Sequence, residues 1–84
     1  MSNRIRKITI GKEPNSTMNY SLGSSQSVLI ESKIQKRIIS DMLLGKNPIT
    51  EKFVYFVYLT NGEETHLWKE LPINDVTSLE YVID

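Results

Sequence analysis

FVYFVYLTNGEETHLWKE, residues 53–70, is the stretch that decides the fold. Its first part, Phe53–Leu59, is an unbroken run of aromatic and aliphatic side chains, the types that favour a β-strand. Asn61-Gly62 follows, the dipeptide that best tolerates positive φ at both centres of a two-residue hairpin turn. Leu67 and Trp68 then resume a strand-like pattern. The stretch predicts a β-hairpin around which the chain packs, but it contains no motif that identifies a function.

A two-residue turn determines which residues lie opposite each other in this hairpin. It pairs Thr60 with Glu63 and Tyr55 with Trp68. Side chains alternate between the faces of a sheet, so one face carries Val54, Phe56, Tyr58 and Leu67, and the other carries Phe53, Tyr55, Val57, Leu59 and Trp68. Both sets are apolar, which predicts a central strand covered on both sides. A bulged three-residue turn would move His66 and Trp68 to the opposite faces, and the sequence leaves this register open.

Length and composition indicate one small domain, residues 1–84, in a reducing compartment. A chain of this size buries about 60–65% of the surface that it exposes when unfolded, enough for one modest core. The absence of cysteine excludes disulfides and thiolate metal sites and favours the cytosol. Residues 53–59 are far shorter than the roughly 20 apolar residues that span a bilayer. The N-terminal sequence MSNRIRKITIGKEP lacks the apolar segment of a secretory signal, so we expect a soluble cytoplasmic protein.

The net charge of zero conceals an asymmetry between the two halves of the chain. Residues 1–46 hold eight basic and three acidic residues, a net charge of +5, and residues 47–84 hold two basic and seven acidic ones, a net charge of −5. Two interpretations follow. Either the halves pair within the fold, or two opposite poles remain on the surface and steer a partner.

The other strands are predicted from alternating apolar and polar residues. The first covers residues 5–10, with Ile8 and Ile10 on one face, and Gly11 ends it. Further strands are expected at residues 18–22, 28–34 and 77–83. Loops are expected where turn-forming residues cluster, at residues 12–17, 23–25, 46–51 and 71–76.

Residues 35–44 fit a helix and a strand about equally. In a helix, apolar residues from Ile34 to Leu43 share one side, and Gly45 stands at the C′ position. In a β-meander, residues 35–37 form a turn and residues 38–44 another strand. The sequence as a whole predicts a mainly β fold (all-β or α+β), an antiparallel sheet or partly open barrel of five to six strands, with at most one short helix near residues 35–44.

The sequence provides little support for catalysis. His66 is the single histidine, and no spacing connects it to a serine and an acid. The serines of GSSQS, residues 23–27, do not form a nucleophile elbow. Glu63 and Glu64 lie at a hairpin tip, where carboxylates are solvated. We therefore expect no enzyme activity, no cofactor and no metal site.

Nucleic-acid binding is a second interpretation. The aromatic strand at residues 53–58 resembles that of an RNA-recognition motif, whose exposed rings stack on bases, although the glycine before the aromatics is absent. Basic residues at 4–7 and 33–37 could contact phosphates without base readout. The alternative is that the rings form the core and that the basic side chains are simply solvated.

Short motifs spread over most of the chain resemble those of a known family. They are RKITIG (6–11), MNYSLG (18–23), YFVYL (55–59), Glu64, LWKE (67–70) and LEY (79–81). Together they resemble a family of small accessory proteins of T-even-type tailed bacteriophages, although residues 28–51 depart from the pattern. The resemblance implies a non-virion protein made early in infection in the bacterial cytoplasm. It also implies action without catalysis, by binding a host component such as transcription machinery, a toxin–antitoxin ribonuclease or another defence effector.

The leading hypothesis is accordingly a non-enzymatic inhibitor that binds a host defence protein, with an RNA-degrading toxin of a toxin–antitoxin system as the first target to test. Binding would use a strand edge, or a charged face with exposed aromatic residues. Candidate contact residues are Arg4, Arg6, Lys33, Lys36 and Arg37. The alternatives are a small RNA- or nucleotide-binding domain that uses the basic N-terminal half, and a structural homo-oligomer. RNA could also be contacted while the target holds it.

Overall fold

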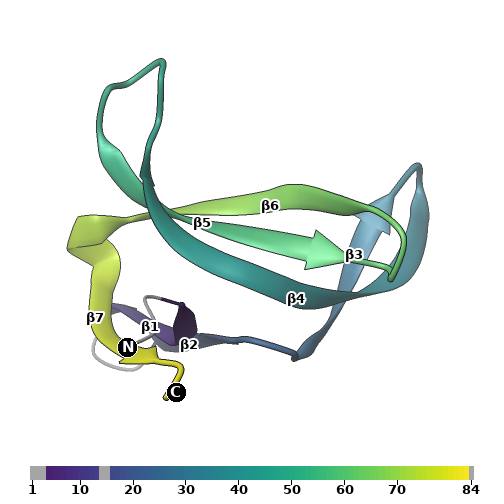
Figure 1. Cartoon of the computed structure of the whole chain (residues 1–84), viewed down its shortest axis with the longest axis horizontal. Helices are drawn as coiled ribbons and strands as arrows, with labels where there is room; N and C mark the ends of the chain where they lie inside the picture. Colours follow the sequence, from purple (N-terminus) through teal and green to yellow (C-terminus); the bar gives the residue numbers. More distant parts are fainter. Residues whose placement is uncertain (1–3, 14–15, 84) are drawn as a thin grey trace.

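In the computed structural model, which describes residues 4–13 and 16–83, the chain is built almost entirely of antiparallel strands (Figure 1). The mainly β prediction is confirmed. The elements are β1 (Ile5–Glu13), β2 (Ser16–Ser21), β3 (Ser25–Ile30), β4 (Lys33–Lys46), β5 (Phe53–Thr60), β6 (Thr65–Pro72), the 3₁₀ turn η1 (Ile73–Asp75) and β7 (Val76–Tyr81). The described residues contain no helix long and apolar enough to cross a membrane.

The strands form two sheets, one of three strands in the order β2-β1-β7 and one of four strands in the order β3-β4-β5-β6. Figure 1 shows the three-stranded sheet on one side of the four-stranded one. The chain crosses between the sheets twice, after β2 and after β6, so the first and last strands pair with each other. The Val82 N–H donates to the Arg4 carbonyl over 2.9 Å and extends this pairing towards the C-terminus.

The core lies between the two sheets, where alternation directs one face of each sheet inwards. The three-stranded sheet contributes Ile5, Ile8, Ile10 and Tyr20, and the four-stranded sheet contributes Ile39, Met42, Tyr55, Val57, Leu59 and Leu71. The hairpin strand β5 is thus central, as predicted. Coverage on both sides was wrong, however, because Val54, Phe56 and Tyr58 face away from the core and remain half-buried.

The β5–β6 hairpin has a different register from the predicted one. Thr60 pairs with Thr65 rather than with Glu63, so the loop has four residues, 61–64. Gly62 has a φ of +100°, whereas Asn61 does not have a positive φ. Asn61 stabilises the loop through its side chain, because its Oδ1 accepts hydrogen bonds from the N–H groups of Glu63 and Glu64 at 2.9 and 2.8 Å. Because the shift is two residues, Leu67 lies on the same face of the sheet as Tyr58, as predicted, although the two residues now pair directly.

A bulge at Trp68 adds one further residue to the shift, so that Tyr55 pairs with Leu71 rather than with Trp68. The Trp68 ring packs edge-on against Tyr20 of the three-stranded sheet, with the ring centroids 5.8 Å apart. The bulge thus directs the one tryptophan towards the core.

Residues 28–44 also differ from the prediction. They form the end of β3, a turn at Glu31-Ser32 and most of β4, with no helix at residues 35–44 and no turn at residues 35–37. Glu31 and Ser32 have φ values of 52° and 65°, the left-handed conformation that a two-residue hairpin turn requires. The strand–turn boundary was missed because neither residue is a glycine or asparagine.

Gly45 lies within β4 and not at a helix C′ position. A Cβ there would meet the Phe56 ring at 2.5 Å, so glycine allows the aromatic ring of the neighbouring strand to lie over the backbone. The predicted first strand also continues beyond Gly11, to Glu13. The predicted loop at residues 12–17 has its centre, residues 14–15, outside the described residues, and β2 begins at Ser16.

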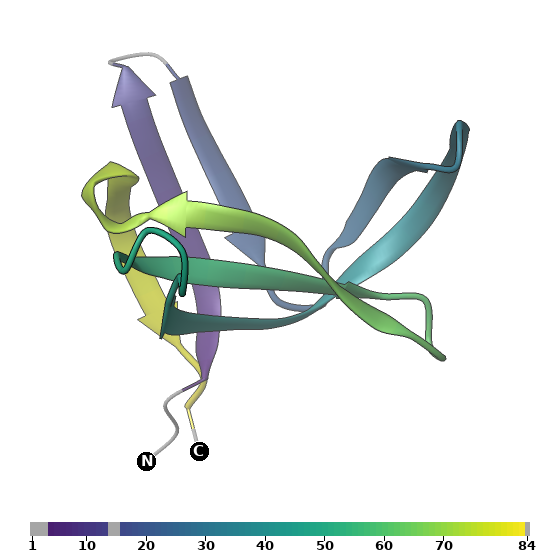
Figure 2. The same cartoon turned by 90° about the horizontal axis from the view of Figure 1, so that it is seen from above.

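The β3–β4 hairpin extends beyond the rest of the four-stranded sheet (Figure 2). β4 pairs with β3 along residues 33–38 but with β5 only from Ile38 onwards. Residues 25–37 therefore form a two-stranded ribbon with no third strand from the described residues on either side, and we call this segment the ribbon.

Candidate protein-binding surface

The ribbon carries three of the five predicted contact residues, namely Lys33, Lys36 and Arg37. Pairing places Lys33 opposite Ile30 and Arg37 opposite Gln26 on one face, whereas Lys36 lies opposite Ser27 on the other. The Arg37 guanidinium donates to Gln35 Oε1 at 2.7 Å and to the Lys36 carbonyl at 3.0 Å. None of the three forms an ion pair with a described residue, so their charges are available to a partner.

Two aliphatic side chains accompany these charges. Leu29 and Ile34 lie directly opposite each other near the ribbon tip, and they are 72% and 77% exposed. They share the face of Lys36. A solvated ribbon gains no stability from such exposure, so apolar side chains here indicate a contact surface. The sequence does not identify these residues, because its alternation predicts one continuous strand over residues 28–34.

β3 has a free hydrogen-bonding edge. Ile39 N–H donates to the Ser24 carbonyl at 3.0 Å, and in an antiparallel ladder the bonded positions recur at every second residue. The N–H and C=O groups of Gln26, Val28 and Ile30 thus point to β4, and those of Ser25, Ser27 and Leu29 point to the open side. β3 therefore presents main-chain donors and acceptors along its length.

Nothing in the sequence of β3 blocks strand addition at this edge. Residues 25–30, SQSVLI, contain no charge and no proline, and their pairing with β4 has no bulge. The opposite edge of the same sheet, β6, carries Lys69, Glu70, Pro72 and a bulge. Charges, proline and bulges are the usual protection of an edge strand, so the two edges of this sheet differ in their readiness to accept another strand.

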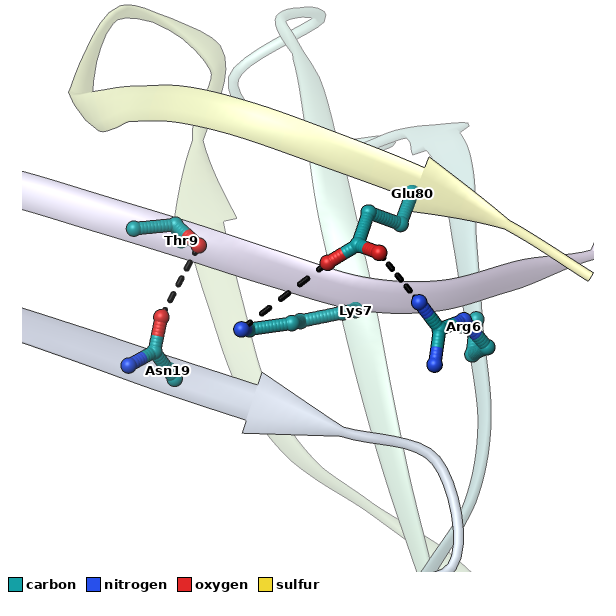
Figure 3. Close-up of polar contacts among 5 residues, drawn as sticks. All are labelled: Arg6, Lys7, Thr9, Asn19 and Glu80. Atoms are coloured by element: carbon teal, nitrogen blue, oxygen red, sulfur yellow. Dashed lines mark hydrogen bonds and ion pairs between the residues drawn. The ribbon is translucent and has the colours of Figure 1, made fainter.

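Arg4 and Arg6, the other two predicted contact residues, lie at the three-stranded sheet and not on the ribbon. Arg6 and Lys7 both form ion pairs with Glu80 of β7, and the Lys7 Nζ–Glu80 Oε2 distance is 3.8 Å (Figure 3). Figure 3 also shows Thr9 Oγ1 bonded to Asn19 Oδ1 at 2.9 Å on the same face. Arg4 Nη2 donates to the Ser40 carbonyl at 3.4 Å and so connects the two sheets. Both arginines thus make contacts within the fold, and their role as partner contacts stays a prediction.

A groove of about 370 Å³ opens between the sheets. Its apolar lining comes from residues such as Ile10, Met18 and Leu71. Lys69 Nζ lies 4.9 Å from the centroid of the Trp68 ring and 5.6 Å from that of Tyr20. The ammonium group is held by two rings, an arrangement that stabilises the cation and fixes the sheets against each other.

The groups considered for catalysis do not converge. His66 is exposed on β6 opposite Leu59 and makes no hydrogen bond to a described residue. Ser24 Oγ donates to the Ser21 carbonyl at 2.7 Å, a turn contact. Among the described residues no three His, Asp or Glu side chains gather closely enough to hold a metal ion.

Comparison of the chain with protein-family models, curated proteins and solved structures found no match. The resemblance to accessory proteins of T-even-type phages therefore stays a prediction. The support for a binding function comes from the ribbon, namely from the open edge of β3 and from cations that form no ion pair with a described residue.

Proposed function

We propose that this protein is a non-enzymatic binding protein that inhibits a bacterial defence protein, and that it engages its target through the ribbon. The observation that carries the proposal is the free, uncharged edge of β3 on a ribbon whose cations are unpaired among the described residues. An exposed strand edge binds an extended segment by main-chain hydrogen bonds, and neighbouring side chains supply specificity.

An extended segment of the target would pair with Ser25, Ser27 and Leu29. Lys33 and Arg37 lie one strand away, on the face that is shared with Gln26 and Val28. Their charges favour acidic side chains on the bound segment. Arg37 is held by its bonds to Gln35 and Lys36, so little side-chain entropy is lost on binding.

Inhibition would follow from occlusion, because a strand captured by the ribbon cannot take part in the target's own fold or active site. An RNA-degrading toxin is the target that we propose to test first, in line with the resemblance to phage accessory proteins. In that case the ribbon cations would also lie near RNA held by the toxin.

A pull-down from a bacterial lysate with quantitative mass spectrometry tests the proposal. Ser27→Pro is the diagnostic bait, because the Ser27 N–H points to the open side and proline there leaves the β3–β4 ladder intact. Ser27→Ala is the matched control. We expect one host protein to be enriched by the wild type and by Ser27→Ala, and to be lost with Ser27→Pro and with the double variant Lys33→Glu/Arg37→Glu.

Two outcomes would overturn the proposal. One is capture of the same protein by Ser27→Pro and by wild type in equal amounts. The other is tight binding of RNA by the purified protein, with an affinity that falls steeply as salt rises, which would favour the nucleic-acid alternative.

A further inference from the structure

The four-stranded sheet has an apolar face that none of the described residues covers. We call it the outer face, the side away from the three-stranded sheet. By the pairing of β3 to β6, the side chains on it include Leu29, Ile34, Ile38, Leu43, Phe56, Tyr58 and Leu67. When an antiparallel sheet has one solvated face, that face is normally polar. Here Leu43, Leu67 and Ile38 remain 38%, 44% and 48% exposed.

The charges on this face are separated along its length. Lys36 lies in the ribbon half, between Ile34 and Ile38. Asp41, opposite Tyr58, and Glu70, opposite Phe56, lie in the other half. The two halves thus have the same apolar character but charges of opposite sign.

We propose that the outer face binds the outer face of a second copy of this chain, in a two-fold symmetric dimer with the axis near Ile38. A two-fold axis that lies between the two outer faces and runs across β4 places the ribbon half of β4 in each copy over the other half of β4 in its partner. Lys36 lies two residues before Ile38, and Asp41 lies three residues after it with the bulge at Ser40 between them. Lys36 of one copy therefore faces Asp41 of the other, and this contact occurs twice.

The apolar character of the face fits a second copy. Homodimer interfaces are more apolar than other protein interfaces. On β4 itself, Ile34, Ile38 and Leu43 are 77%, 48% and 38% exposed.

The dimer does not compete with the proposed function. The free N–H and C=O groups of β3 lie in the plane of the sheet, and Lys33 and Arg37 lie on the opposite face. Each dimer would therefore present two target-binding edges. The dimer itself needs no target, so its test is independent.

Charge exchange between Lys36 and Asp41 tests the dimer, measured as sedimentation-equilibrium mass at low salt. We expect the wild type to sediment as a dimer. We also expect Lys36→Glu and Asp41→Lys each to raise the dimer dissociation constant by at least about tenfold, because each places like charges opposite each other twice. The double variant Lys36→Glu/Asp41→Lys restores opposite charges and should recover the dimer.

Lys33→Glu is the matched control, since it makes the same charge change on the other face of the ribbon and should leave the dimer unchanged. Circular dichroism establishes that each variant is folded. A wild type that is monomeric at concentrations up to about 1 mM, where even a weak dimer would populate, would overturn the proposal. A dimer that Lys36→Glu does not weaken, or that the double variant does not restore, would overturn it equally.

Discussion

Gly45 and Phe56 show how a single residue adjusts the surface of the sheet. The ring occupies the space above Gly45 that a side chain would fill, with ring carbons 2.5 and 2.8 Å from an ideal Cβ position. Phe56 also lies beside Tyr58, with ring centroids 6.4 Å apart. The glycine therefore determines where the aromatic side chains of the outer face lie.

Gly45→Ala is expected to destabilise the protein by about 1–3 kcal/mol, the usual cost of overpacking, because the Phe56 ring must move. Urea unfolding measures the change. Gly11→Ala is the matched control, since its nearest side-chain contact would be an ordinary 3.4 Å. Equal effects at the two glycines would contradict the proposed role of the ring.

Tyr55 predicts a dependence of stability on pH. Burial, with a smaller contribution from Tyr81, raises the pKa of the Tyr55 hydroxyl above its ordinary value. In the unfolded chain the Tyr55 hydroxyl ionises at about pH 10, which is a lower pH than in the folded protein. The contribution of Tyr55 to stability is therefore complete below that pH and is lost as pH rises through the folded pKa.

Other groups titrate in the same range, so the difference between wild type and Tyr55→Phe isolates this effect. The wild type should lose more free energy of unfolding than Tyr55→Phe between about pH 8 and about pH 11. Parallel curves for the two proteins would show that Tyr55 is not the cause.

At the scale of elements, the ribbon is the least supported part of the fold. Among the described residues its two strands pair only with each other, and a two-stranded hairpin is at best marginally stable alone. Val28 on the inward face packs against the core, whereas Leu29 and Ile34 on the other face are exposed. Binding at this element can therefore be coupled to its ordering.

The turn at Glu31-Ser32 is a place where ribbon stability can be raised. Both residues have positive φ, which costs free energy for non-glycine residues. Replacement by Asn-Gly, through Glu31→Asn and Ser32→Gly, should stabilise the ribbon by about 1 kcal/mol, because this pair prefers the required turn. Amide hydrogen exchange at Ile30 and Lys33 should slow, and unchanged or faster exchange would contradict the turn type.

This turn also shows what could be predicted from the sequence. The alternation of apolar residues predicts β1 within a few residues, because burial of one face requires that pattern. The unbroken apolar run before Asn61-Gly62 predicts β5 equally closely. The turn at residues 31–32 has no glycine, asparagine or proline, so its strand was extended too far. Lys33, Lys36 and Arg37 were recognised as a group, but their division between two faces depends on that turn and could not be predicted.

At the scale of the whole molecule, the opposite charges of the two halves are partly paired and partly left on the surface. Arg6 and Lys7 meet Glu80 where the first and last strands lie side by side. The ribbon, which carries Lys33, Lys36 and Arg37, instead extends away from the rest of the four-stranded sheet (Figure 2). Part of the charge asymmetry is thus neutralised within the fold and part of it remains on the surface, whereas the steering of a partner stays a prediction.

The paired region should contribute little to stability. The side chains of Arg6 and Glu80 are 56% and 43% exposed, and pairs of this kind contribute about 0–1 kcal/mol. Glu80→Gln is therefore expected to change the free energy of unfolding by less than about 1 kcal/mol, as measured by urea titration. A loss well above that range would show that the pairing of β1 with β7 depends on this charge.

Strand addition at β3 is the central claim, and residue-resolved amide hydrogen exchange tests it most directly, on the free protein and on its complex with the captured host protein. The amides of Ser25, Ser27 and Leu29 should exchange rapidly in the free protein and become strongly protected in the complex. Those of Gln26, Val28 and Ile30, already bonded to β4, should change less. Protection elsewhere, with Ser25, Ser27 and Leu29 still exchanging rapidly, would contradict the account.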